Sequence, residues 1–227
     1  MTIQFHQAIQ SILEMPYYKN DHAQSGKVFS KHEEAVAERI RLAGFTEFKK
    51  SQFPKLKPNI LKKWVRDGDD TQLRSVTYGL PPGSYILQPA NSQGFPDILV
   101  KDFNDRYISV ECKSVEKNST PMWNDNLPRP DSIYVLSSGI TNSTTVFLGK
   151  DVITPEEQRL MIEQEKLVLE IVKQYNEKMK ELDKFNRGWI LRSRKQHSQG
   201  GGGLKTNYFT HTSRKLCEDN VLEYALK

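Results

Sequence analysis

The chain has 227 residues, a length at which one domain can bury a hydrophobic core without disulfides or structural metals. Its 33 Lys and Arg against 28 Asp and Glu give a formal net charge of +5, and ten Phe, nine Tyr and three Trp exclude a wholly disordered chain. Two cysteines exclude a disulfide framework, no apolar run approaches the ~18 residues of a membrane helix, and the N-terminus lacks the pattern of a secretory signal, so we expect a soluble intracellular protein.

Two amphipathic helices are predicted near the N-terminus. The first covers residues 1–15, where apolar residues recur at helical spacing. The second begins at Ser30, which forms a capping-box pattern with Glu33, and ends at Gly44. A basic stretch follows at residues 47–66, with seven Lys and Arg against one acidic residue, and two prolines break it.

Between residues 85 and 150 the apolar pattern becomes that of β-strands, and Asn104-Asp105 supplies a turn between two of them. The Asn- and Pro-rich residues 118–130 are predicted to be a loop. The predicted strands are Tyr85–Leu87, Ile98–Phe103, Tyr107–Lys113, Ile133–Ser137 and Thr144–Leu148.

The C-terminal part combines a long helix with a basic segment. A capping box at Thr154 opens a helix over residues 155–186, which at about 1.5 Å per residue is long enough to project from the domain or to pair with another helix. Residues 187–215 contain no Asp or Glu, seven Lys and Arg, and four consecutive glycines. A short helix over residues 218–226 is predicted to close the chain.

The sharpest chemical signal lies on the pair of strands between residues 97 and 113. Glu111 and Lys113 are two residues apart on one strand and therefore share a face, and Asp97 begins the preceding strand. Two carboxylates and an ammonium on one sheet face suit Mg²⁺, which prefers a few carboxylate oxygens and keeps bound waters that can attack a phosphodiester. The alternative is an exposed strand that carries an ordinary Glu/Lys pair.

The register of these two strands decides whether the three side chains meet. A two-residue loop would pair Asp97 with Cys112 and place it on the wrong face, whereas a three-residue loop would pair it with Lys113. The catalytic interpretation therefore requires an odd-length loop, a bulge or a bend before Asp97. Asp102 and Asp105 are expected to be residues of this turn rather than ligands.

Pro96-Asp97 followed by Glu111-Cys112-Lys113 resembles the motif of the PD-(D/E)XK nucleases and, more narrowly, that of a type II restriction endonuclease. The motif covers residues 96–113, and the supporting order of elements extends over most of the chain. A Met-Trp-Asn loop and the run Asn142–Asp151 are also similar to several restriction enzymes. The resemblance implies an α/β fold, with a restriction-endonuclease-like central mixed β-sheet flanked by helices, in a single nuclease domain over residues 1–227.

The resemblance also implies roles for the site residues. Asp97 and Glu111, together with the backbone carbonyl of Cys112, would bind Mg²⁺, and Mn²⁺ would substitute for it. Lys113 would orient the attacking water or stabilise the transition state. Enzymes of this class often add a carboxylate from the N-terminal helix, and Glu33 can face the sheet in that role, although it can equally do no more than complete the capping box.

Two basic segments are predicted to contact DNA, and for each the alternative is a solvated basic loop. Residues 47–66 are rich in Lys and suit phosphates, whereas residues 187–215 mix Arg with amides and glycine and suit base edges. The predicted phosphate-binding residues are Lys55, Lys57, Lys62 and Lys63. The predicted base-reading residues are Arg192, Arg194, Lys195, Gln196, Gln199 and Asn207.

These observations together predict a type II site-specific deoxyribonuclease that makes sequence-specific, Mg²⁺-dependent double-strand cuts by phosphodiester hydrolysis. The family's chemistry implies 5′-phosphate and 3′-hydroxyl products. A palindromic duplex has a two-fold axis, so we expect a homodimer, with the helix over residues 155–186 as the first candidate for its contact. The resemblance further implies the cytoplasm of a prokaryotic cell, no membrane partner, and a cognate DNA methyltransferase in the same cell that the enzyme does not touch.

Three other functions are compatible with the sequence. One is a DNA-repair or junction-resolving nuclease of the same fold, which would recognise DNA shape more than base sequence. Another is a DNA-binding protein with a catalytically dead core, against which the intact acidic and lysine motif argues. The third is an interaction protein organised by the long helix, whose heptads are interrupted by Gln164 and Glu165.

Overall fold

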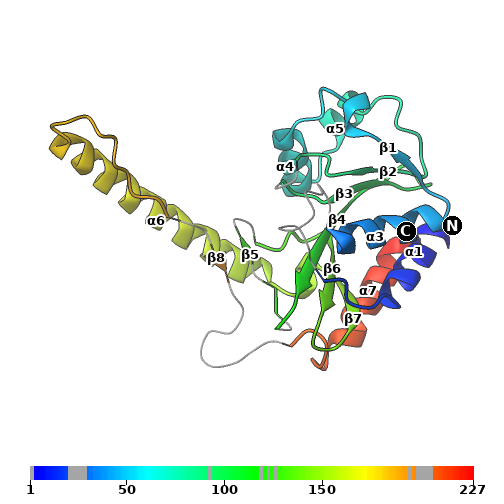
Figure 1. Ribbon diagram of the computed structural model, residues 1–227. Coiled ribbons are helices and arrows are strands. Elements are labelled where there is room, and N and C mark those ends of the chain that lie inside the picture. Colours follow the sequence, from blue (N-terminus) through cyan, green and yellow to red (C-terminus); the bar gives the residue numbers. More distant parts are fainter. Residues whose placement is uncertain are drawn as a thin grey trace.

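The computed structural model of this chain describes residues 3–19, 30–91, 94–117, 120–121, 123–124, 127–193, 196–197 and 207–227. Its centre is a six-stranded mixed sheet with the strand order β1-β2-β3-β4-β6-β7 (Figure 1). The pairs β1–β2 and β4–β6 are parallel and the other neighbours are antiparallel. The strands are β1 (Thr46–Phe48), β2 (Ser84–Leu87), β3 (Ile98–Lys101), β4 (Tyr107–Val115), β6 (Ile133–Ser138) and β7 (Ser143–Leu148).

Helices cover both faces of the sheet because its central strands are apolar on both sides. Ile98 and Val110 belong to the core against α1, α3 and α7, whereas Leu99 and Tyr107 belong to the core against α4 and α5. A third, aromatic cluster around Trp123 packs on β6 and β7. The helices are α1 (Ile3–Leu13), α3 (Lys31–Leu42), α4 (Pro58–Asp67), α5 (Thr71–Val76), α6 (Pro155–Leu182) and α7 (Arg214–Leu226), with 3-10 turns at Lys50–Gln52 and Gly149–Asp151.

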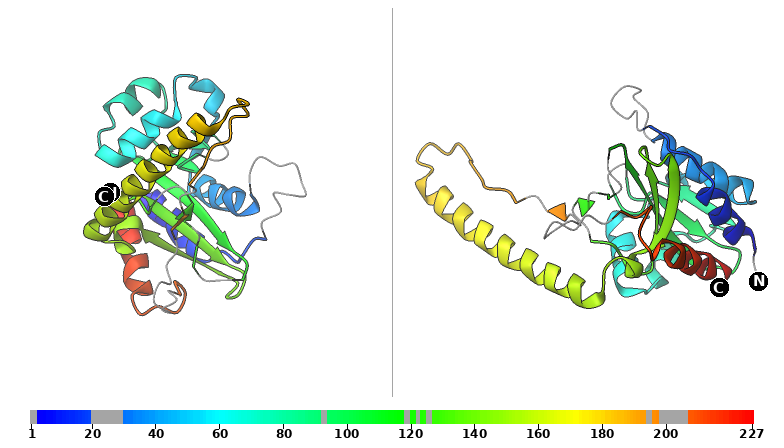
Figure 2. Two further views of the ribbon diagram at one scale, coloured as in Figure 1. Left: turned by 90° about the vertical axis from the view of Figure 1, so that its left-hand side faces the viewer. Right: turned by 90° about the horizontal axis from the view of Figure 1, so that it is seen from below.

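The longest helix, α6, leaves the body and has no buried residue (Figures 1 and 2). The chain then turns at Asp183 and runs back along the helix, where the Asn176 side chain forms two hydrogen bonds with the Leu191 backbone, of 2.9 and 2.6 Å. We call residues 155–193, which comprise α6 and this returning segment, the arm. Beyond it, β8 (Gln196–His197) pairs with β5 (Trp123–Asn124).

The structure confirms the predicted α/β class, the mixed sheet flanked by helices, and all five predicted strands. The helix expected over residues 155–186 ends four residues early, at Leu182, because Asp183 already leaves the helical conformation. Asn186, with a positive φ of 53°, lies in the turn that follows and reverses the chain. The last helix begins at Arg214 rather than residue 218, because Arg214 and Lys215 form ion pairs with the acidic residues four positions later.

Helices α4 and α5 and three short strands were not predicted. Helix α4 lies inside the basic stretch, where Pro58 occupies the first helical turn instead of breaking a helix, and Gly68 ends the helix with a φ of 72°. The strands β1, β5 and β8 have only two or three residues each and carry no alternation to detect.

Among the described residues, no helix combines the length and the apolar composition needed to cross a membrane.

Candidate active site

Strands β3 and β4 form a hairpin whose five connecting residues, 102–106, are held by a buried acid. The carboxylate of Asp102 accepts hydrogen bonds from the backbone N–H of Asn104 and of Arg106, at 2.9 and 2.8 Å, and pairs with the Arg106 guanidinium. Asp105 pairs with Arg74 and, at 2.9 Å, with Lys101. Both acids therefore stabilise the turn, as predicted.

The odd length of this loop brings Asp97 to the face of Glu111 and Lys113. Strand β3 begins with Ile98 opposite Val110, so the register continues to Asp97 opposite Glu111. A three-residue loop, as considered from the sequence, would place Asp97 opposite Lys113. The actual loop is two residues longer, and the residue opposite Asp97 is therefore Glu111. A shift of two residues preserves the face, so the required convergence is present.

Asp97 lies just before β3, next to the edge of β4. Its Oδ2 accepts a hydrogen bond from the backbone N–H of Cys112 at 2.7 Å. Burial raises the pKa of the Asp97 carboxyl well above its ordinary value, and the negative charges of Glu111 and Glu33 raise it further. The Cys112 N–H and the Lys113 ammonium oppose this rise. A carboxylate in these surroundings is stabilised by any additional cation.

Glu111 and Lys113 form an ion pair on β4. The Lys113 Nζ donates to Glu111 Oε1 at 2.8 Å, and the two side chains are 26% and 13% exposed respectively. Burial lowers the pKa of Lys113, but the Glu111 carboxylate outweighs it, so the pKa lies above its ordinary value. The other Glu111 oxygen, Oε2, is buried and has no hydrogen-bond partner among the described residues. The pair therefore offers an ammonium and one carboxylate oxygen that is not engaged.

Cys112 contributes its backbone and not its thiol. Its side chain packs against the core under α1 and α3, and burial raises the pKa of the thiol well above its ordinary value. The N–H and C=O of one strand residue point to the same edge of the strand. Since the Cys112 N–H meets Asp97, we expect the Cys112 carbonyl on that edge too.

Glu33 lies in the first turn of α3 and reaches the same region. Ser30 Oγ accepts the backbone N–H of Glu33 at 3.1 Å, which is one half of the predicted capping box. The Glu33 carboxylate instead accepts a hydrogen bond from Gln88 Nε2 at 3.1 Å, and the Gln88 backbone N–H donates to the Asp97 carbonyl at 2.6 Å. Gln88 thus connects the two acids. No local sequence pattern indicates this role of Gln88.

Arg129 and Tyr134 are further side chains near Glu111, and no sequence motif marks either of them. Tyr134 lies opposite Glu111 on β6, and its hydroxyl accepts the backbone N–H of Arg129 at 2.8 Å. The Arg129 guanidinium lies 4.5 Å from the centre of the Phe95 ring. Burial lowers the pKa of Arg129, and the charges of Tyr134 and Glu111 oppose this shift. An arginine stays protonated, so this residue adds a cation near the site.

The donor set partly suits a hard cation. No three carboxylate, imidazole or thiol side chains in the described part of the chain converge as a complete metal-binding group. Mg²⁺, however, is commonly held by one or two carboxylates and retains several waters. The buried Glu111 Oε2 and the neighbouring Asp97 carboxylate supply such a pair. These residues therefore fit Mg²⁺ with water and backbone ligands, and do not form an all-protein cage.

The predicted phosphate-binding lysines are on the surface around α4. The apolar residues of this region, including Phe53 and Trp64, point into the core, which leaves the cationic side chains outside. In Figure 1, α4 lies at the upper left of the body, on the side from which the arm projects. The exposed lysines are Lys55, Lys57, Lys62 and Lys63.

The predicted base-reading segment divides into parts with different outcomes. Arg192 is exposed on the arm, and Gln196 lies in β8. Asn207 uses its side-chain oxygen in a local turn, where it accepts the backbone N–H of Phe209 at 2.9 Å and of Thr210 at 3.2 Å. Arg194, Lys195 and Gln199 lie outside the described residues.

Comparisons with known proteins found no relative of this chain. No family model, no curated protein and no solved structure matches the chain. The functional interpretation therefore depends on the arrangement of Asp97, Glu111 and Lys113 and on the surfaces around them. The Met-Trp-Asn loop offers no exposed aromatic side chain at Trp123, because this residue is only 3% exposed and packs in the aromatic cluster.

Proposed function

We propose that this chain is a metal-dependent endonuclease that hydrolyses phosphodiester bonds in double-stranded DNA, with its catalytic centre on β3 and β4. The observation that carries the proposal is the convergence of Asp97, Glu111 and Lys113 on one sheet face, with Asp97 bonded to the Cys112 backbone. The mixed sheet and the motif hairpin are what a PD-(D/E)XK nuclease requires. A type II restriction endonuclease is the narrower form of this proposal.

The metal would be bound by carboxylate and carbonyl oxygen atoms at the start of β3 and on β4. Asp97 and Glu111 would bind Mg²⁺ or Mn²⁺ through their carboxylates, and Cys112 through its carbonyl. When bound, the cation supplies acidified water and neutralises charge on the phosphate. It would also offset the burial and the repulsion from Glu111 and Glu33 that together raise the pKa of Asp97.

Lys113 acts as a cation rather than as a base in this proposal. Its pKa lies above the ordinary value because Glu111 is beside it, so the side chain is protonated at neutral pH. A protonated ammonium cannot accept a proton from water. It can donate hydrogen bonds that orient the attacking water, or stabilise charge that develops on the phosphate in the transition state. The expected products are 5′-phosphate and 3′-hydroxyl ends.

Exposed lysines around α4 would bind the phosphates of the duplex. Arg192, on the returning segment of the arm, and Gln196, in β8, would read bases. The protein would then act in a prokaryotic cytoplasm beside a cognate DNA methyltransferase. A repair or junction-resolving nuclease would use the same site and differ in the DNA that it recognises. A catalytically dead DNA-binding protein would bind the same duplex without cutting it.

Digestion of a sequenced plasmid with the purified chain and Mg²⁺ tests these options together. The proposal predicts discrete fragments with 5′-phosphate ends, and none with the Asp97→Asn variant or in chelator. Cleavage of branched DNA alone would favour a junction-resolving nuclease. Binding without cleavage in Mg²⁺ and in Mn²⁺ would contradict the enzymatic proposal.

A further inference from the structure

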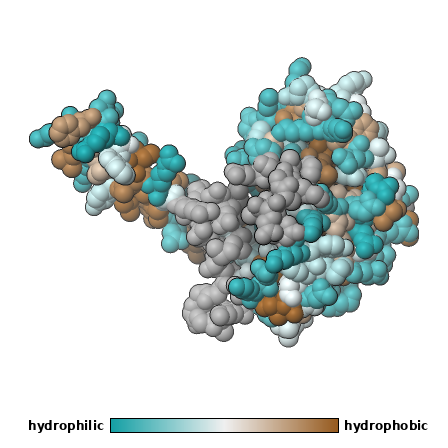
Figure 3. Space-filling view, viewed as in Figure 1, coloured by the Kyte–Doolittle hydropathy of each residue, from teal (hydrophilic) through white to brown (hydrophobic). Residues whose placement is uncertain are grey.

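The arm exposes a line of large apolar side chains along α6, which Gln164 interrupts between Leu160 and Leu167. Apart from one adjacent pair, these residues are three, four or seven positions apart, which places them on one side of the helix, as in a helix that packs against another. Figure 3 shows hydrophobic side chains along the arm, away from the body. The members of this apolar stripe are Leu160, Leu167, Val168, Ile171, Tyr175 and Leu182, each between 41% and 73% exposed.

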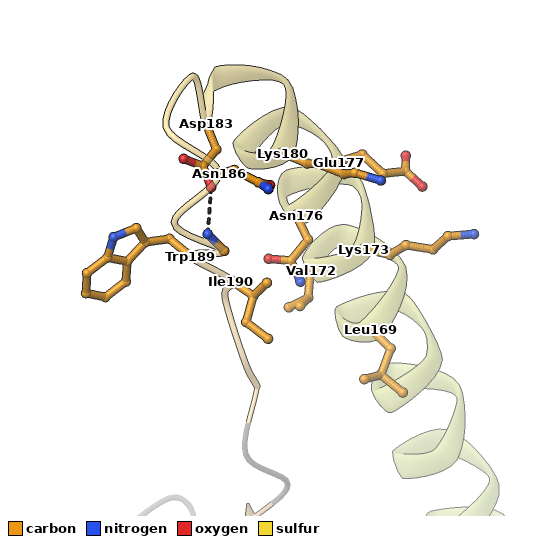
Figure 4. Close-up of a pocket in the computed structure, with 11 residues that line it drawn as sticks. Leu169, Val172, Lys173, Asn176, Glu177, Lys180, Asp183, Asn186, Trp189 and Ile190 are labelled. Carbon is orange, nitrogen blue, oxygen red and sulfur yellow. Dashed lines mark hydrogen bonds between the residues drawn. The ribbon is translucent and has the colours of Figure 1, made fainter.

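The returning segment of the arm packs elsewhere on α6. Ile190 points toward Val172 and Trp189 points away from the helix (Figure 4). Asn176 fixes this segment through its two hydrogen bonds with Leu191. The turn that begins the segment is closed by the Gly188 N–H, which donates to Asp183 at 2.6 Å. The chain's own described residues therefore leave the apolar stripe uncovered.

The charge of the arm does not suit the DNA backbone. Residues 155–193 contain eight acidic and eight basic side chains, so the arm is neutral although the whole chain carries +5. A surface that binds phosphates has an excess of Lys and Arg. Exposed apolar patches of this extent instead mark contacts with proteins. A protein surface is therefore the occupant that the apolar stripe on α6 favours.

The same charges are divided unevenly along the arm. Residues 155–170, next to the body, have five acidic and two basic side chains, a net of −3. Residues 171–193, at the far end, have three acidic and six basic side chains, a net of +3. Two arms side by side in opposite directions would place each acidic half against a basic half, whereas two arms in the same direction would place like charges together.

We propose that the apolar stripe is the contact surface for a second copy of this chain, with the two arms packed antiparallel about a two-fold axis. Such an interface is self-complementary, because the same residues of both copies meet. Helix α6, with 28 residues, is about 42 Å long and roughly 11 Å wide, so pairing would bury on the order of 1,000 Å² in total. That area is about the minimum for a specific interface.

The mass of the full chain in solution, measured without DNA by light scattering, tests the contact independently of any nuclease activity. We expect a dimer of two 26.2 kDa chains. A variant with Leu167→Glu and Ile171→Glu should dimerise at least about 100-fold more weakly, because it puts charge into the stripe. The matched control is Leu42→Glu with Ile140→Glu, which changes one leucine and one isoleucine outside the arm, 62% and 63% exposed. This control should leave the dimer intact.

Charge reversal tests the direction of packing. Glu163→Lys and Lys178→Glu, which flank or lie within the stripe, should each weaken the dimer about threefold, and an equimolar mixture of the two variants should recover it. Arms packed in the same direction would give the opposite result for the first variant, a tighter dimer, because two acidic halves would no longer repel each other.

Three results would overturn the proposal. The first is a monomeric wild-type chain at up to about 100 µM, which would show that the stripe is covered by something other than a second copy. The second is a dimer that the stripe variant and its control leave equally intact. The third is a dimer that the first charge reversal strengthens. Circular dichroism of each variant shows whether α6 is still helical, and a folded stripe variant that remains dimeric counts against the proposal.

Discussion

The Asp97 carboxylate accepts a hydrogen bond from the backbone N–H of Cys112 at 2.7 Å, and this bond ties the residue before β3 to the strand that carries Glu111 and Lys113. Asp97 precedes Ile98, the first residue of β3, so this side-chain bond begins where the backbone pairing of β3 with β4 has ended. The N–H favours the charged form of Asp97, whereas burial and the neighbouring acids disfavour it. The carboxylate is thus oriented by the backbone and stabilised by an added cation.

Neutral substitutions at the site should separate catalysis from folding and from DNA binding. Asp97→Asn keeps an oxygen for the Cys112 N–H, and Glu111→Gln and Lys113→Met preserve side-chain size. Each should lower the rate of plasmid cleavage by at least about 10²-fold, because it removes a charge that acts on the metal or the phosphate. Binding of duplex DNA should change little. Asp131→Asn, at a side chain 76% exposed, is the control that should cut normally.

Metal binding should be measurable as thermal stabilisation in the absence of DNA. Mg²⁺ or Mn²⁺ at about 100 times its Kd should add about 2.7 kcal/mol to the free energy of unfolding, because it binds the folded site only. Asp97→Asn and Glu111→Gln should abolish the rise in Tm, and Asp131→Asn should retain it. Ca²⁺ should support DNA binding without turnover, since it prefers longer and looser coordination. An equal rise in all variants would place the metal elsewhere.

Elements with strong local signals could be predicted from the sequence, and long-range ones could not. Ser30 and Gly44 mark the ends of α3, and Thr154 marks the start of α6. Pro58 is compatible both with a break and with a first helical turn, and only the packing of Trp64 against Tyr107 distinguishes them. Strand β1 exists through its parallel pairing with β2, far along the chain, and its three residues show no pattern of their own.

The site shows the same division. The shared face of Glu111 and Lys113 follows from the strand period, and the need for an odd loop before Asp97 follows from the sequence. The actual register depends on the buried Asp102 in the turn, which composition does not reveal. Gln88 joins the site from a different strand and has no motif.

The role of Glu33 can be separated from helix capping. Ser30 caps the backbone N–H of this residue, which a substitution at the side chain leaves in place, and the Glu33 carboxylate meets Gln88 instead. If it acts as an auxiliary carboxylate, Glu33→Gln should lower cleavage about tenfold, a loss of roughly 1.4 kcal/mol in transition-state stabilisation, with an unchanged Tm. Its exposed neighbour supplies the control, Glu34→Gln. A lowered Tm with full activity would show a structural role alone.

Buried His32 should make the fold sensitive to mild acid. Its Nε2 donates to the Val135 carbonyl at 3.2 Å, and burial lowers its pKa from 6.5 to about 4. The unfolded chain therefore binds a proton first as the pH falls, so stability present above pH 6.5 is lost progressively down to about pH 4, by up to about 3 kcal/mol. Urea unfolding of His32→Gln should show a flatter dependence over this range. His211→Gln, at an exposed histidine, should follow the wild type.

The lysines around α4 should contribute affinity without sequence preference. Each is a flexible point charge on the surface, which suits a phosphate and releases a counterion when it binds. Alanine at any one of them should weaken the binding of cognate and scrambled duplexes equally and make the slope of log affinity against log salt shallower by about 0.9.

Lys166→Ala and Lys173→Ala, on the neutral arm, are matched controls that should leave the slope unchanged. If instead the α6 variants flatten the slope and the α4 variants do not, the DNA backbone lies along α6. That result would contradict both the phosphate-binding assignment and the argument that α6 contacts a protein. The substitutions to compare on α4 and the loop before it are Lys55→Ala, Lys57→Ala, Lys62→Ala and Lys63→Ala.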